Sequence, residues 1–140
     1  MAGMDPGRTA RDLEQWAAGL EQRAQRFTDL HQRMNALRIT ETSSDGAVRV
    51  TVDGNGSPTE LTLTERSAGV EPGQLSAELM SCLHRAQAGL RAQVEQLTEE
   101  TVGDDEAGAV IVDQYTQRFP DRGEPDDYEE RRIGDDVDDD

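Results

Sequence analysis

Residues 46–56 read Gly-Ala-Val-Arg-Val-Thr-Val-Asp-Gly-Asn-Gly, and this stretch decides the fold. Its valines alternate with polar residues, which is typical of a β-strand with one apolar face. The aspartate, glycines and asparagine that follow favour a tight turn. Apolar and polar residues alternate again over 60–64, and residues 39–42 have the composition of a strand upstream. The pattern therefore predicts a three-stranded antiparallel meander.

Long helical patterns flank the predicted sheet. Residues 9–38 contain no proline, and a large apolar residue recurs at every seventh position from Leu13 to Met34. This spacing predicts a long amphipathic helix that packs along another helix. Over 74–100, apolar residues recur at steps of three or four, and Gly103 provides a stop. We expect an α+β fold in the order long helix, three strands, long helix.

The predicted helices are too long for the predicted sheet. A helix of roughly 29 residues is about 44 Å long, whereas a strand of about seven residues spans about 23 Å. Each helix should therefore overhang the sheet, and its uncovered apolar stripe needs a partner. The same stripe of a second chain is the simplest partner. We expect a homodimer with paired projecting helices.

Negative charge gathers at the carboxyl end of the chain. The 140 residues carry a formal net charge of −16, and only 34% of them are hydrophobic, which is too few for the whole chain to form one packed globule. Residues 99–140 hold 17 of the 30 acidic residues and only four arginines. Such blocks of like charge repel one another and bury too little apolar surface to fold. The sequence predicts a mostly disordered acidic tail over 104–140.

One part of the predicted tail is apolar. Val110, Ile111, Tyr115 and Phe119 lie together before Pro120. These residues are either isolated hydrophobes in a solvated segment or a short docking motif, which would bind the chain's own core or a protein partner. The sequence leaves these alternatives open.

No motif in the sequence indicates catalysis or metal binding. A lone cysteine, Cys82, excludes an internal disulfide and a cysteine-based zinc cluster, and its apolar neighbours favour a place in the core. The only histidines, His31 and His84, lack the partners of a catalytic or metal site. Gly54 and Gly56 lack the third glycine and the following helix of a phosphate-binding loop. We expect no enzyme, no cofactor and no metal.

The predicted elements together resemble the YbaB/EbfC family of small bacterial nucleoid-associated proteins. The resemblance rests on the first helix, the stretch from Ser44 to Gly56, the returning strand at 61–63 and the second helix. It covers about residues 20–100 and is most specific over 46–54. The resemblance implies an α/β dimer in which the sheets meet and paired helices project like tweezers. It also implies binding of duplex DNA with little sequence preference, and an influence on chromosome organisation or transcription.

On this resemblance, residues 9–103 are the expected dimerisation and DNA-binding domain, after a flexible N-terminus at 1–8 and before the acidic tail at 104–140. Short members of the family have no counterpart of the tail, and the helices are less basic than a strong DNA binder requires. The use of arginine as the only basic residue is similar to that of actinobacterial members. Some YbaB-like proteins of such bacteria resemble adaptors around specialised secretion systems, so a scaffold that binds no DNA is the alternative function.

Arginines are the candidate DNA contacts. Contact with phosphates requires only positive charges at helical spacing and carries no sequence information. In the alternative, the arginines pair with neighbouring acids on a solvated helix flank. A flexible acidic tail would compete with DNA for the arginines and so attenuate binding. The predicted DNA-binding residues are Arg23, Arg26, Arg33, Arg38 and Arg49.

The sequence also predicts where the protein works. No apolar run approaches the roughly 20 residues that span a bilayer, and the N-terminus lacks the apolar core of a signal peptide. We expect a cytoplasmic protein at the nucleoid, without membrane contact. Its expected partners are a second copy, duplex DNA and, through the tail residues Val110, Ile111, Tyr115 and Phe119, a protein.

Overall fold

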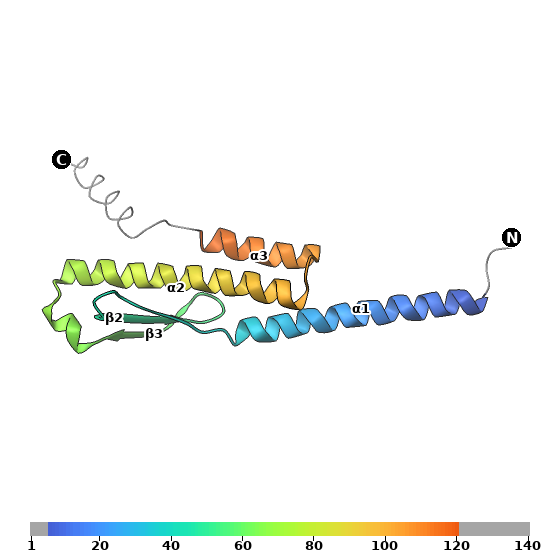
Figure 1. The fold of residues 1–140 in the computed structure, drawn as a ribbon, viewed down its shortest axis with the longest axis horizontal. Coiled ribbons are helices and arrows are strands. Elements are labelled where there is room, and N and C mark those ends of the chain that lie inside the picture. Colours follow the sequence, from blue (N-terminus) through green and yellow to red (C-terminus); the bar gives the residue numbers. More distant parts are fainter. Residues whose placement is uncertain (1–5, 121–140) are drawn as a thin grey trace, which may run out of the picture.

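One long helix covers one face of a small sheet, a second long helix projects from the end of the sheet, and a third helix lies along the covering helix (Figure 1). The computed structural model describes residues 6–120. The order of helix, three strands and helix agrees with the prediction from the sequence. The elements are α1 (Pro6–Asn35), β1 (Ile39–Thr42), β2 (Val48–Val52), β3 (Pro58–Leu63), the 3-10 helix η1 (Glu65–Gly69), α2 (Pro72–Thr101) and α3 (Glu106–Arg118).

The sheet is the predicted antiparallel meander, in the strand order β1-β2-β3. Its two turns contain Gly46 and Gly56, whose φ angles of 75° and 79° favour glycine. In the second turn, the Asp53 carboxylate accepts hydrogen bonds from the backbone N–H groups of Asn55 and Ser57. This local network fixes the register of β2 against β3.

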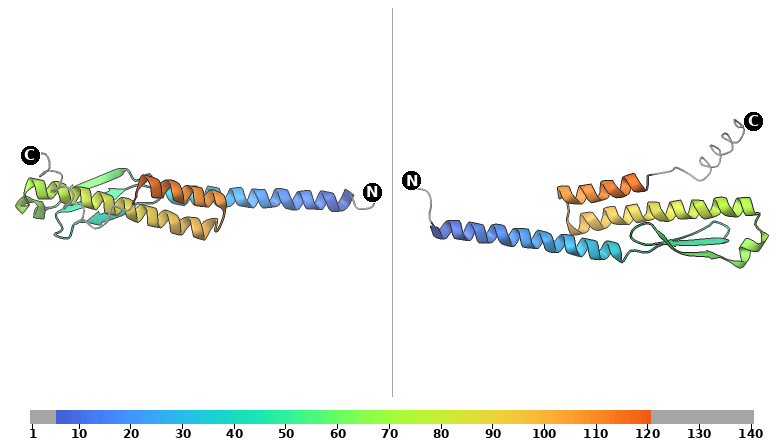
Figure 2. Two further views of the ribbon diagram at one scale, coloured as in Figure 1. Left: turned by 90° about the horizontal axis from the view of Figure 1, so that it is seen from above. Right: turned by 180° about the vertical axis from the view of Figure 1, so that it is seen from behind.

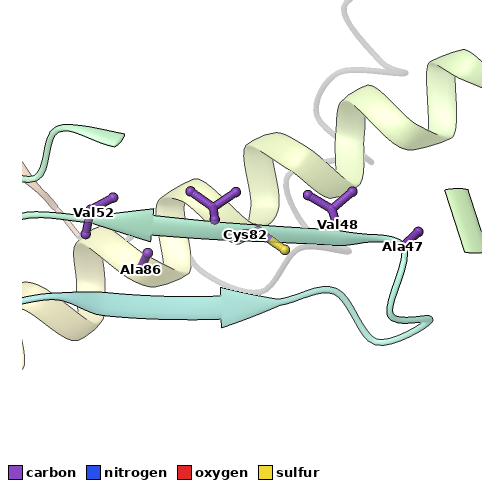
Figure 3. Packing of buried hydrophobic residues seen from close by; sticks show 6 residues of the cluster. Ala47, Val48, Val52, Cys82 and Ala86 are labelled. Atoms are coloured by element: carbon purple, nitrogen blue, oxygen red, sulfur yellow. The ribbon is translucent and has the colours of Figure 1, made fainter. Parts of the chain in front are cut away.

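The valine face of β2 packs against α2. Val48, Val50 and Val52 are at most 1% exposed, and they form one cluster with Cys82 and Ala86 of α2. Figure 3 shows these small side chains between the strand and the helix. Cys82 is therefore a core residue, as its neighbours in the sequence predicted. Small residues on α2 let the helix approach the sheet closely.

The outer strand β3 is only partly covered. Leu61 pairs with Val50 and Leu63 pairs with Val48, so both leucines point to the same face of the sheet as the valines. Because α2 packs on β1 and β2, Leu61 and Leu63 remain 48% and 49% exposed. Met80 of α2 is also exposed. An apolar strip thus remains open along this edge of the sheet.

A second core forms where three helices meet. Leu30 and Met34 of α1, Leu90 and Val94 of α2, and Tyr115 of α3 are all buried in one cluster. The views of Figure 2 agree that α3 runs beside the second half of α2. The overhang of α2 that the lengths predicted is therefore covered within the chain, by α1 and α3.

The N-terminal half of α1 projects away from the rest of the molecule (Figure 1). Its apolar residues continue the stripe that is buried further along the helix, but Leu13, Trp16 and Leu20 are 60%, 65% and 47% exposed. The predicted overhang of the first helix is therefore present. Residues 6–8, predicted as part of a flexible terminus, belong to this helix.

The prediction of a mostly disordered tail from residue 104 is wrong for α3. The acidic residues of the carboxyl end are unevenly distributed, and residues 107–118 contain a single one, Asp113. Ile111, Tyr115 and Phe119 recur at steps of four, so they form one apolar face that packs on the second core. Asp105 caps the helix by accepting from the backbone N–H of Ala107. The strongest acidic blocks, in 121–140, lie outside the described residues.

Candidate nucleic-acid interface

Two of the predicted arginines share one face of α1. Arg26 and Arg33 are seven residues apart and exposed, and both border a shallow groove between α1 and α2. Arg33 forms an ion pair with Asp29, with an Nε–Oδ2 distance of 3.2 Å. This pair is exposed, so it contributes little to stability and leaves the guanidinium accessible to a phosphate.

The same face continues along the projecting half of α1. Arg8 and Arg11 are exposed and precede Arg26 at helical spacings, with the polar Gln15 and Gln22 between them. We call Arg8, Arg11, Arg26 and Arg33 the basic stripe. From its first to its last arginine the stripe is about 38 Å long at about 1.5 Å per residue, which is close to the roughly 34–36 Å of one turn of duplex DNA.

Arg8 and Arg11 were absent from the predicted contacts. Arg8 lay in the segment predicted to be flexible, so no helix face was assigned to it. The spacing of three residues between Arg11 and Arg8, and of fifteen between Arg26 and Arg11, could have identified the stripe once the helix was known to begin at Pro6.

The Arg23 guanidinium lies one helical turn before Arg26 and is turned from the stripe toward the start of α3. It donates two hydrogen bonds to the Asp105 carboxylate, from Nε to Oδ2 at 2.7 Å and from Nη2 to Oδ1 at 2.9 Å. It also lies over the Phe27 ring, 5.0 Å from the centroid. The Arg23 guanidinium and the N-cap hydrogen bond together lower the pKa of Asp105 to about 2. The stabilisation from this carboxylate is therefore present above about pH 4, and it is lost as the pH falls toward 2.

The remaining predicted arginines lie elsewhere. Arg38 follows α1 and donates to the carbonyl oxygens of Leu37 and Asn35, at 2.7 and 3.3 Å. Arg49 is exposed on the open face of the sheet, between its register partners Thr42 and Thr62. The structure thus brings Arg26 and Arg33 together but places Arg23, Arg38 and Arg49 at three separate positions.

Comparison with known proteins identifies the family of this chain. Residues 10–105 match the model of the YbaB/EbfC DNA-binding family. The chain belongs to this family. It is also similar to a nucleoid-associated protein of Caulobacter sp. (strain K31), with 34% identity over 80 residues, which cover 56% of this chain and 73% of the relative. No solved structure matches the chain. The matched YbaB/EbfC region contains α1 from residue 10, the sheet and α2, and it ends just before α3 begins.

In this YbaB/EbfC protein, α3 is attached to the turn between β2 and β3. The Tyr115 hydroxyl donates to the Gly54 carbonyl oxygen at 2.7 Å, and Arg118 Nη2 donates to the Asn55 carbonyl oxygen at 2.9 Å. The Phe119 ring packs directly on Gly56, where a Cβ atom would lie 2.2 Å from the ring. Of the predicted docking residues, Ile111, Tyr115 and Phe119 therefore pack on the chain's own core. Val110 is 57% exposed.

The described part of this YbaB/EbfC chain contains no group of three or more histidine, cysteine or acidic side chains that could hold a metal ion. Among the same residues, no helix has both the length and the hydropathy that crossing a bilayer requires. His31 is exposed on α1 and His84 is half-buried on α2.

Proposed function

We propose that this protein is a nucleoid-associated protein that binds duplex DNA with little sequence preference, through phosphate contacts of the basic stripe. The family and the nucleoid-associated relative support DNA as the ligand. The stripe supports the place of contact, because its arginines are exposed along one helix face. Phosphate contacts of this kind position a protein on DNA without reading bases. We place the protein at the nucleoid in the cytoplasm.

The test is fluorescence anisotropy of a labelled random duplex titrated with the full chain at several salt concentrations. We expect binding at low salt that weakens as salt rises, since each neutralised phosphate adds about −0.9 to the logarithmic salt slope. In the double variant Arg8→Gln/Arg26→Gln, the salt slope should become shallower by about 0.9 for each phosphate contact that is lost. The matched control, Arg38→Gln with Arg49→Gln, makes the same change in charge outside the stripe and should leave the slope unchanged.

Two results would contradict the proposal in different ways. If the two double variants lose affinity equally, the stripe is not the interface. If the unmodified chain binds no duplex even at low salt, the DNA-binding function itself is wrong for this chain. That second result would favour the alternative of a scaffold or adaptor that acts through protein contacts.

In this proposal the protein is a homodimer. Two apolar surfaces support this: the stripe of Leu13, Trp16 and Leu20 on α1, and the strip of Leu61 and Leu63 on β3. A projecting helix of this length without tertiary contacts is marginal in water, so it needs a partner. Both surfaces lie on the side where α2 packs, so one two-fold axis along the molecule would pair sheet with sheet and α1 with α1. The dimer would carry two basic stripes.

The segment after residue 103 attenuates DNA binding in this proposal. The ion pair between Asp105 and Arg23 supports attenuation, because it keeps the Arg23 guanidinium from binding a phosphate. Arg23 lies one helical turn before Arg26. Arg23 is the arginine of α1 that would extend the phosphate contacts once freed. The attenuation therefore acts by an ion pair between α1 and the start of α3, in addition to the negative charge of the more distant residues 121–140.

Asp105→Asn is the sharp test of attenuation. Asparagine caps a helix about as well as aspartate, so α3 should stay folded while Arg23 loses its ionic partner. We expect severalfold tighter binding of the random duplex and a salt slope steeper by about 0.9 per chain. Asp104→Asn is the matched control, since it removes the same charge one residue away without touching Arg23. Equal gains from both variants would show a general charge effect and contradict release of Arg23.

A further inference from the structure

A shallow groove of about 520 Å³ runs between the second half of α2 and α3. Ala109 and Val112 of α3 give its lining an apolar part, beside Thr98 and Thr116. Its α3 wall begins at Glu106, beyond the region that matches the family. The groove therefore combines one wall from the matched region with a second wall, α3, from the extension beyond it.

Carboxylates line both sides of this groove. Glu95 and Glu99 stand one turn apart on α2, and Asp104 and Asp113 stand on the opposite side. Within residues 6–120, Glu95, Glu99 and Asp104 form no ion pair with an arginine. Asp113 accepts a hydrogen bond only from the neutral side chain of Gln117. Like charges that lack a counter-charge repel each other, so a cationic occupant would stabilise this surface.

The occupant that fits is a side chain rather than a metal ion. The carboxylates are spread along the groove, and in the described part of the chain no three such groups converge to hold a metal. A hydrated cation would also gain nothing from the apolar part of the lining. A segment with arginine or lysine flanking a row of small apolar residues would satisfy both features, because its long basic side chains reach the rims while its apolar side chains cover Ala109 and Val112.

We propose that this groove docks a basic amphipathic helix of another protein. DNA carries the same sign of charge as the rims, so the groove and the basic stripe select different partners. The protein would then hold DNA along α1 and a basic protein between α2 and α3. This inference does not depend on the proposed function, since it rests on α2 and α3 alone.

The probe is a labelled synthetic helix of about 14 residues, with alanine and leucine on one face and arginines on its two flanks. Its anisotropy is followed at physiological salt with the full chain. We expect saturable binding that falls about tenfold in the Glu95→Gln/Glu99→Gln variant. The matched control, Glu14→Gln with Glu21→Gln on α1, makes the same change in charge and should reduce binding less than twofold. Ala109→Gln fills the apolar part of the groove without changing charge and should also abolish most of the binding.

Four results would overturn the proposal. Equal losses in the two glutamate variants, or undiminished binding by Ala109→Gln, would mean that the net negative charge attracts the peptide without a site. Equal binding of a peptide with the same composition and scattered arginines would exclude recognition of an amphipathic face. Sedimentation that changes in Glu95→Gln/Glu99→Gln without peptide would assign the groove to a second copy. Binding of duplex DNA is also measured for each variant. Failure of the groove proposal can therefore be distinguished from failure of the proposed DNA interface.

Discussion

Gly54→Ala is expected to lower the free energy of unfolding by about 3 kcal/mol, at the upper end of the cost of overpacking. A Cβ atom at Gly54 would lie 2.1 Å from the carbonyl oxygen of Met34 and 3.0 Å from its carbonyl carbon. These are backbone atoms of the last turn of α1, so they cannot move aside as a side chain would. The carbonyl oxygen of Gly54 also accepts the hydrogen bond from the Tyr115 hydroxyl. The substitution therefore separates α1, the β2–β3 turn and α3 at once.

Urea unfolding followed by circular dichroism measures this loss. Gly73→Ala is the matched control, because it makes the same chemical change on α2 with no heavy atom within 4 Å. Alanine should be neutral to slightly stabilising there, by up to about 1 kcal/mol. Ordinary surface substitutions change the free energy of unfolding by at most about 0.5 kcal/mol. If Gly54→Ala changes it by no more than this, the end of α1 does not pack on the turn as described.

The Leu13→Gln/Leu20→Gln variant is expected to dissociate the proposed dimer. Glutamine keeps the helix propensity of leucine, so α1 should remain helical. The two side chains are 60% and 47% exposed in the single chain, and covering each of them contributes about 1 kcal/mol. A dimer loses four such contributions, so we expect the dissociation constant to rise by about a hundredfold or more.

Sedimentation equilibrium measures the change against a chain mass of 15.4 kDa. Gln15→Ala with Gln22→Ala, on the opposite face of α1, should leave the dimer intact. Leu61→Gln with Leu63→Gln tests the sheet contact separately and should also weaken the dimer. A monomeric unmodified chain would contradict the dimer, and dissociation by the β3 variant alone would contradict pairing of the α1 helices.

The sheet could be predicted from the sequence because its information is local. Alternating valines give the buried face of β2, and the glycines at 54 and 56 mark the turn. The long helices were also readable, since their apolar spacing persists over many turns. Local pattern therefore predicted the order of elements and the burial of Cys82.

The features that the sequence did not reveal depend on contacts between distant residues. Arg23 occupies a position where the heptad pattern calls for an apolar residue, but its partner Asp105 lies 82 residues away. No spacing rule connects the two. Similarly, α3 is weakly apolar by itself, and it is ordered because α1 and α2 have left a surface for Tyr115 and Phe119. Average charge is a poor guide wherever a short neutral segment lies inside an acidic region.

The attachments of α3 also bear on how this chain can change over evolutionary time. Tyr115 and Arg118 bond to main-chain carbonyl oxygens of the turn, and Arg91 bonds to the carbonyl oxygen of Phe119. Contacts of this kind recognise the path of a backbone and are indifferent to the identity of the side chains along it. The turn is therefore free to exchange Asn55 for other residues while its glycines stay fixed. An attachment to backbone carbonyl oxygens is portable, and we expect α3 to fold on any related domain whose turn follows the same path and whose first two helices keep the apolar surface that Tyr115 and Phe119 cover.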